Sequence, residues 1–282
     1  MEIIKTRALS GELYFPAALA AKGAALVIMS SSAGVCDVRE RFYARFFAAK
    51  GYTAFVVDSF GPRGIKETLS DQSRIADEDM EKDAYAAYAH LKDNGMVDPE
   101  RIAVMGVSRG GSIALHTALA ARRAWFSRPK NDFAAHICLV PPCYMQQRYP
   151  GVSGRPILFM LAGKDDFTGV EQARLYAERM REHGADITLL TYPEAHHAWE
   201  ATGKLVYLPL AENYSSSLFW IEDDGRISGV SGEKSMTRQE FFRRRERWRV
   251  LGAHAGGGNA ALKSQAAADI AVFLEERGIV PV

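Results

Sequence analysis

The sequence predicts an α/β protein with a mostly parallel central sheet and helices on both faces. Short apolar runs alternate along the chain with segments of helical periodicity, as is typical of parallel strands joined by helices. The run Ala24 to Met29 is continuously apolar, which indicates a strand buried on both faces. The predicted strands are Ala24 to Met29, Thr53 to Val57, Ala103 to Val107, Ala134 to Val140, Pro156 to Leu161 and Asp186 to Tyr192.

Helices are predicted between these strands. Val38 to Lys50 places Phe42 and Phe46 on one face, and Gly51 is a natural C-terminal stop. The same pattern predicts helices at Ile113 to Ala121, Val170 to His183, about Asp77 to Lys92 and about Asn259 to Arg277. Before the first buried strand, Ile3 to Leu9 and Glu12 to Phe15 indicate a hairpin at the edge of the sheet.

Residues 198–258 interrupt the alternation. Ser217 to Val230 predicts a hairpin around Asp223-Asp224-Gly225, and Thr237 to Val250 predicts an arginine-rich helix. Glutamates interleave with those arginines, which favours a solvated helix face over a surface for an acidic partner. We expect this excursion to lie over or beside the sheet edge that carries the active site. No linker or repeat divides the 282 residues, so we expect a single domain over 1–282.

Composition excludes several classes of function. A formal net charge of +1 gives no field that would attract nucleic acid or an anionic membrane. No apolar run is long enough to span a bilayer, and Met1 to Ser10 lacks the apolar core of a signal peptide. The three cysteines have no metal-ligand spacing. We therefore expect a cytoplasmic protein without a metal.

The strongest motif is Gly106-Val-Ser-Arg-Gly110, which lies between a predicted strand and a predicted helix. In that setting Ser108 occupies a strained turn, and a side chain at Gly106 or Gly110 would clash across the bend. The turn lifts the Ser108 hydroxyl above the sheet edge, next to the free N–H groups of the helix N-terminus.

Acidic and basic side chains follow later strands. The ends of predicted strands carry Ser30 to Gly34, Ser108, the pair Asp165-Asp166 and the pair His196-His197. Carboxyl ends of parallel strands meet at one sheet edge, where α/β proteins bind ligands. A serine nucleophile needs a histidine base held by a carboxylate, and the order Ser, Asp, His is that of the α/β-hydrolases. Position alone leaves either aspartate and either histidine open.

The chain resembles the dienelactone hydrolase family of the α/β-hydrolase fold. The resemblance rests on Arg101 to Gly111, Val57 to Gly64, Ala162 to Thr168 and Tyr192 to Trp199. It implies Asp165 as the acid, His197 as the base and the backbone amides of Ser32 and Arg109 as oxyanion donors, with no metal or organic cofactor. Founding members use a cysteine where this chain has Ser108, and related hydrolases commonly have His-Gly where it has Ser30-Ser31.

These observations predict a serine hydrolase that cleaves small to medium-sized carboxylic esters or lactones. The alternatives are a peptidase or amidase on the same fold and a non-catalytic binding protein. Arg63, Cys143 and Trp199 are candidate substrate contacts, although loop-fixing hydrogen bonds and ordinary packing are alternative roles for them. We expect a monomer or homodimer with a small-molecule substrate and neither a nucleic-acid nor a membrane partner.

Overall fold

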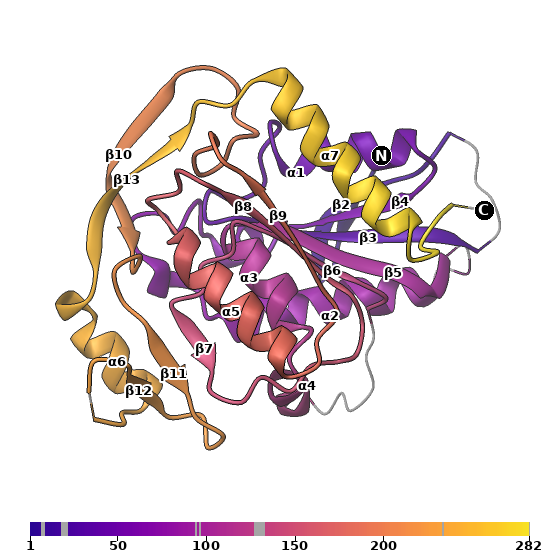
Figure 1. Ribbon diagram of the computed structural model, residues 1–282. Coiled ribbons are helices and arrows are strands. Elements are labelled where there is room, and N and C mark those ends of the chain that lie inside the picture. The colour runs from indigo at the N-terminus through magenta and orange to yellow at the C-terminus, as the bar shows by residue number, and fades with distance from the viewer. Residues whose placement is uncertain are drawn as a thin grey trace.

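A mostly parallel sheet forms the centre of the protein (Figure 1). The computed structural model describes residues 1–6, 9–17, 22–93, 95, 97–126, 133–232 and 234–281. Within these residues the sheet has eight strands in the order β1-β2-β4-β3-β5-β6-β8-β9. Their bounds are β1 Glu2–Lys5, β2 Ser10–Tyr14, β3 Gly23–Met29, β4 Thr53–Val57, β5 Val97–Val107, β6 His136–Leu139, β8 Ile157–Ala162 and β9 Ile187–Tyr192. The predicted fold class is confirmed.

The N-terminal hairpin supplies the antiparallel part of this sheet. β1 pairs with β2, and β2 pairs with β4, both in antiparallel register. From β4 to β9 neighbouring strands are parallel, so their carboxyl ends lie at one edge. Residues 7 and 8 of the first predicted strand lie outside the described residues.

Helices cover both faces, and each face has its own apolar core. On one face, side chains from α2 (Asp77–Asp93), α3 (Arg109–His116) and α5 (Val170–Glu182) pack against the sheet. On the other face the helices are α1 (Glu40–Ala49) and α7 (Ala260–Glu275). The predicted helix from Ile113 to Ala121 is instead divided between α3 and α4 (Ala120–Trp125).

The excursion contains more strand structure than the sequence predicted. β11 (Phe219–Ile221) and β12 (Ile227–Gly229) form the expected hairpin, and β11 also pairs in parallel with β7 (Met145–Gln147). β10 (Leu205–Asn213) and β13 (Val250–Gly256) form a two-stranded antiparallel ribbon, which was not predicted. Figure 1 shows ribbon and hairpin together at one side of the central sheet.

The arginine-rich helix is shorter than predicted. α6 covers Arg238–Arg244 and is followed by a single 3-10 turn, η3 (Arg245–Arg247). The turn lets Trp248 fold back and stack on Phe241, with ring centroids 5.3 Å apart, before the chain enters β13. The prediction of a helix to Val250 was therefore wrong at its C-terminal end. Two further 3-10 turns are η1 (Gly61–Arg63) and η2 (Gln72–Arg74). In the part of the chain described, no helix combines the length and apolarity needed to cross a membrane.

Candidate active site

Ser108 lies on a sharp turn between β5 and α3. Its backbone has a positive φ, with φ 57° and ψ −123°, a conformation that costs a non-glycine residue about 1–3 kcal/mol. The flanking glycines are sterically required: a Cβ on Gly106 would lie 2.3 Å from the carbonyl carbon of Gly110, and one on Gly110 would lie 2.6 Å from the Met29 oxygen. The predicted turn is present, and the Ser108 amide is fixed by donating to the Leu139 carbonyl at 2.8 Å.

Asp165 and His197 form a buried hydrogen-bonded pair at the ends of β8 and β9. His197 Nδ1 lies 2.9 Å from Asp165 Oδ2. The same carboxylate accepts from the amides of Phe167 and Thr168 at 2.8 and 2.9 Å and from the Thr168 hydroxyl at 2.7 Å. Burial raises the pKa of Asp165, but His197 and the Thr168 hydrogen bonds outweigh it, so the pKa lies below its ordinary value. An ionised Asp165 holds the proton on Nδ1 and leaves His197 Nε2 as the base.

The neighbouring aspartate and histidine face elsewhere. Asp166 accepts from the His254 amide at 2.9 Å and contacts His254 Nδ1 at 2.7 Å, while the His196 ring lies 6.3 Å from the ring of His254. The Asp166 and His254 side chains are 49% and 41% exposed, whereas those of Asp165 and His197 are 1% and 4% exposed. The geometry therefore favours Asp165 and His197 as the acid and base.

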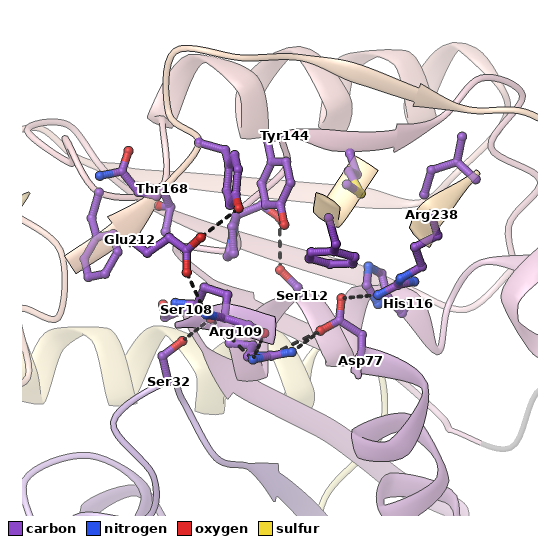
Figure 2. Close-up of a pocket in the computed structure, with 18 of the residues that line it drawn as sticks. Ser32, Asp77, Ser108, Arg109, Ser112, His116, Tyr144, Thr168, Glu212 and Arg238 are labelled. Carbon is purple, nitrogen blue, oxygen red and sulfur yellow. Dashed lines mark hydrogen bonds and ion pairs between the residues drawn. The ribbon is translucent and has the colours of Figure 1, made fainter. Parts of the chain in front are cut away.

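A pocket of about 80 Å³ opens beside Ser108 (Figure 2). Phe167 and Thr168, which follow the candidate acid, line this pocket together with Ser108. The Phe167 ring also lies 4.7 Å from the imidazole of His197, so the pocket wall joins the serine to the Asp165–His197 pair. Among the described residues no hydrogen bond links Ser108 Oγ to His197; in ligand-free enzymes catalytic hydrogen bonds are often long and tighten in the substrate complex.

The candidate oxyanion amides belong to the same pocket. Ser32 and Arg109 both line it, and neither backbone N–H has an acceptor among the residues described. Arg109 is the first residue of α3, where helix geometry leaves the amide free. The loop that carries Ser32 is held by one carboxylate, because Glu40 accepts from the amides of Ser31 and Cys36 at 3.1 and 3.0 Å.

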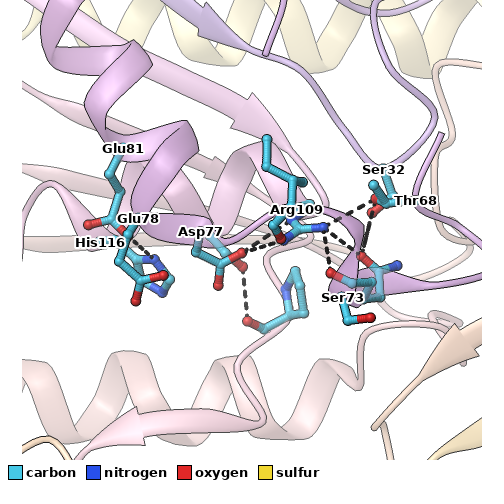
Figure 3. Close-up of polar contacts among 12 residues, drawn as sticks. Ser32, Thr68, Ser73, Asp77, Glu78, Glu81, Arg109 and His116 are labelled. Atoms are coloured by element: carbon cyan, nitrogen blue, oxygen red, sulfur yellow. Dashed lines mark hydrogen bonds and ion pairs between the residues drawn. The ribbon is translucent and has the colours of Figure 1, made fainter. Parts of the chain in front are cut away.

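The Arg109 side chain forms structural hydrogen bonds and an ion pair (Figure 3). It donates to Asp77 at 2.8 Å, to the Ile75 carbonyl at 2.6 Å and to the Gln72 carbonyl at 3.0 Å. These bonds tie the start of α3 to the segment before α2.

The predicted substrate contacts lie outside this pocket. Arg63 forms a two-point ion pair with Asp83 at 2.8 and 3.1 Å and also donates to the Ser59 carbonyl, so it fixes its own loop. Cys143 is 1% exposed within the core, and burial raises the pKa of its thiol. Trp199 is fully buried and packs on Tyr192 at 5.2 Å. Arg63 is held by a distant partner, Asp83, that the sequence does not reveal, whereas Cys143 and Trp199 are core side chains.

The excursion instead supplies much of the wall opposite Ser108. Its lining side chains come from β10 and the following residue, from β11 and from α6; they are Glu212, Asn213, Tyr214, Ile221, Arg238 and Phe242. Glu212 is 1% exposed and accepts from the Gln72 amide at 2.8 Å and the Tyr214 hydroxyl at 2.9 Å. The sequence indicated only that this segment lies near the edge; no motif distinguished the lining residues.

The fold and the candidate site together define the structural class of the protein. A serine on a strand-to-helix turn, and a buried Asp–His pair after later parallel strands, are the features of the α/β-hydrolase fold. The dienelactone hydrolase family model matches residues 9–216. The chain belongs to the dienelactone hydrolase family.

Individual relatives are more distant. A putative carboxymethylenebutenolidase of Methylorubrum extorquens is 28% identical over 173 residues, which are 56% of this chain and 57% of that protein. An acylamino-acid-releasing enzyme of Arabidopsis thaliana is 23% identical over 54% of this chain and 24% of that enzyme. The chain thus spans between about a quarter and just over half the length of these curated relatives.

Solved structures agree on the fold. Esterase 2 of Thermogutta terrifontis phosphorylated by paraoxon superposes with a TM-score of 0.53 at 21% identity, over 68% of this chain and 79% of that one. The same esterase phosphonylated by sarin gives 0.54 at 18% identity, over 70% and 83%. At these identities the likeness shows a shared fold.

Proposed function

We propose that the protein hydrolyses carboxylic esters or lactones of small to medium size, with Ser108 as nucleophile, His197 as base and Asp165 as acid. The observation that carries this proposal is the buried hydrogen bond between His197 Nδ1 and Asp165 Oδ2, 2.9 Å long, at the strand ends beside the Ser108 turn. The family and the esterase fold of the solved neighbours support the same reaction.

The proposed mechanism assigns one role to each group of the candidate site. His197 Nε2 takes the proton of Ser108 as Oγ attacks the carbonyl carbon, and the amides of Ser32 and Arg109 stabilise the oxyanion by about 3–4 kcal/mol per donor. The imidazolium is stabilised by Asp165 and then protonates the leaving alcohol. His197 next removes a proton from water, which attacks the acyl-serine and releases the acid. Each step uses groups of this chain and water.

Replacement of the nucleophile tests the proposal. Ser108→Ala should lower hydrolysis of a short 4-nitrophenyl ester to the background rate, because no other hydroxyl is held on the turn. Ser264→Ala, on the exposed face of α7, is the matched control and should keep wild-type activity. Turnover retained by a folded Ser108→Ala protein would exclude Ser108 as the nucleophile.

Two alternatives have direct tests. The similarity to acylamino-acid-releasing enzymes supports a peptidase or amidase as the second candidate. Such an enzyme would release 4-nitroaniline from the 4-nitroanilide of an acylated amino acid. A non-catalytic binding protein would leave Ser108 unmodified by a fluorophosphonate, whereas the proposed hydrolase should lose activity as Ser108 is labelled.

Several further predictions accompany this function. They are a cytoplasmic location, a monomeric or homodimeric state, a single domain and the absence of a nucleic-acid partner. The near-neutral formal charge supports the last of these.

A further inference from the structure

We propose that the site selects electrically neutral esters and lactones and discriminates against substrates that carry a carboxylate. This inference rests on the proposed ester hydrolysis at Ser108. Its basis is the pairing of the basic side chains that line the pocket: in the described part of the chain, each of them already contacts a carboxylate of this protein.

Arg109 has no free donor for a substrate. Its Nε donates to Asp77 Oδ1 at 3.2 Å, and its Nη2 donates to Asp77 Oδ1 at 2.8 Å and to the Ile75 carbonyl at 2.6 Å. Its Nη1 donates to the carbonyl and to the side-chain oxygen of Gln72 at 3.0 and 3.3 Å. The side chain is only 8% exposed. An incoming carboxylate would have to displace Asp77, which lies 2.8 Å from Arg109 and 3.7 Å from Arg238.

Arg238 and Arg122 share a second carboxylate. Arg238 Nη1 donates to Glu78, and its Nη2 lies 3.7 Å from Asp77. Arg122 Nη1 lies 3.5 Å from Glu78, and its Nε and Nη2 donate to Glu81, which is fully buried. Glu78 thus joins α6 of the excursion to the start of α2, and Figure 3 shows it beside Asp77 and Glu81.

The other titratable side chains of the pocket wall also have partners within this chain. His116 Nδ1 lies 3.0 Å from Glu81 Oε1. The lining carboxylate Glu212 lies 3.4 Å from Arg245 and accepts two hydrogen bonds. Five carboxylates (Asp71, Asp77, Glu78, Glu81 and Glu212) therefore face four guanidinium groups (Arg109, Arg122, Arg238 and Arg245). A charged substrate would lose hydration without gaining a free counter-ion.

The rest of the pocket suits a neutral substrate. Apolar side chains of Phe167, Ile221 and Phe242 line it, together with neutral polar groups on Ser112 and Asn213. An uncharged ester can replace water against these groups at small cost.

A pair of esters of nearly equal shape tests the inference. Ethyl levulinate and monoethyl succinate differ in that a neutral methyl ketone replaces the carboxylate. For the wild-type enzyme we expect kcat/KM to be at least about tenfold higher for the levulinate ester. Ethanol release measures both.

Charge variants at the wall should move this ratio in opposite directions. Glu78→Gln removes the nearer of the two carboxylates beside Arg238 and should lower the neutral-to-anionic ratio by about threefold or more. Arg238→Gln leaves Glu78 with Arg122 as its only guanidinium partner among the described residues and should raise the ratio. Glu100→Gln removes an exposed ion pair with Arg155, 2.7 Å long, near the start of β5, and should leave the ratio unchanged. Thermal unfolding verifies that each variant is folded.

The outcomes separate the two proposals. Equal or faster hydrolysis of monoethyl succinate by the wild-type enzyme would overturn the selectivity and leave ester hydrolysis intact. The selectivity would also be overturned if neither Glu78→Gln nor Arg238→Gln changed the ratio of kcat/KM for the neutral ester to kcat/KM for the anionic ester. Hydrolysis of neither ester, nor of the 4-nitrophenyl ester, would overturn the proposed function and this inference with it.

Discussion

Two adjacent aspartates, Asp165 and Asp166, have opposite environments. Asp165 is buried against His197, whereas Asp166 is half exposed against His254. We predict that Asp165→Asn lowers kcat by about 10⁴-fold, because an amide in place of the carboxylate favours the wrong histidine tautomer and does not stabilise the imidazolium. Ester hydrolysis under substrate saturation measures the effect.

Asp166→Asn is the matched control for that prediction. It makes the same chemical change one residue away and should alter kcat by less than about threefold, because Asp166 contacts neither Ser108 nor His197. The reverse ranking of the two variants would mean that Asp166 is the catalytic acid.

The roles of some residues could be predicted from the sequence, and those of others could not. Gly106, Ser108 and Gly110 were predictable because a local steric requirement imposes their spacing. Arg63 was not, because its role depends on Asp83, which lies 20 positions away on α2. A side chain with a distant partner leaves no local pattern.

At the scale of elements, the loop between β3 and α1 depends on Glu40. This carboxylate accepts from amides at both ends of the loop, Ser31 and Cys36. In Glu40→Gln the side-chain oxygen can still accept from one of these two amides, but the side-chain NH₂ group faces the other amide and cannot accept from it. The loop should therefore loosen, and the backbone amide of Ser32, which the loop carries, should lose its fixed direction. We predict a kcat about tenfold lower with KM nearly unchanged, since oxyanion contacts act mainly in the transition state.

Steady-state kinetics on a folded sample decide that prediction. Glu40→Ala, which removes both acceptors, should be slower still. A rise in KM at constant kcat would instead indicate that Glu40 shapes substrate binding.

Elements of the central sheet were predictable, and those of the excursion were only partly so. Buried parallel strands appear as continuous apolar runs, as in β3 and β4. β10 is largely exposed, carries Pro209 and pairs with the glycine-containing β13, so neither its burial nor its composition marks a strand. Two arginines expected on a solvated face, Arg238 and Arg245, instead contact acidic residues of the same chain.

The whole molecule should lose stability in acid, in part through His136. This histidine is fully buried on β6, with Nδ1 2.9 Å from the Thr117 hydroxyl, and burial lowers its pKa from 6.5 to about 3. Below about pH 6.5 the unfolded chain binds a proton that the folded protein excludes. The free energy of unfolding should therefore fall by about 2 kcal/mol between about pH 6.5 and 4.5 from this group alone.

Urea unfolding at several pH values measures this effect. His136→Asn keeps an N–H donor near Thr117 but does not titrate, so its stability should decline less steeply over the same range. Parallel pH profiles for the variant and the wild-type protein would contradict the assignment.

The excursion leaves and rejoins the central fold at nearly the same point. Thr202 bridges to Gly258, the Gly203 amide donates to the Gly258 carbonyl at 3.3 Å, and the Gly256 amide donates to the His197 carbonyl at 2.8 Å. Because the two ends are pinned together beside the histidine loop, the intervening segment can change in length and sequence while α7 and the His197 loop keep their anchors. We therefore expect that replacing this segment with one of another length or sequence would alter the pocket wall while the Asp165–His197 pair stays in place.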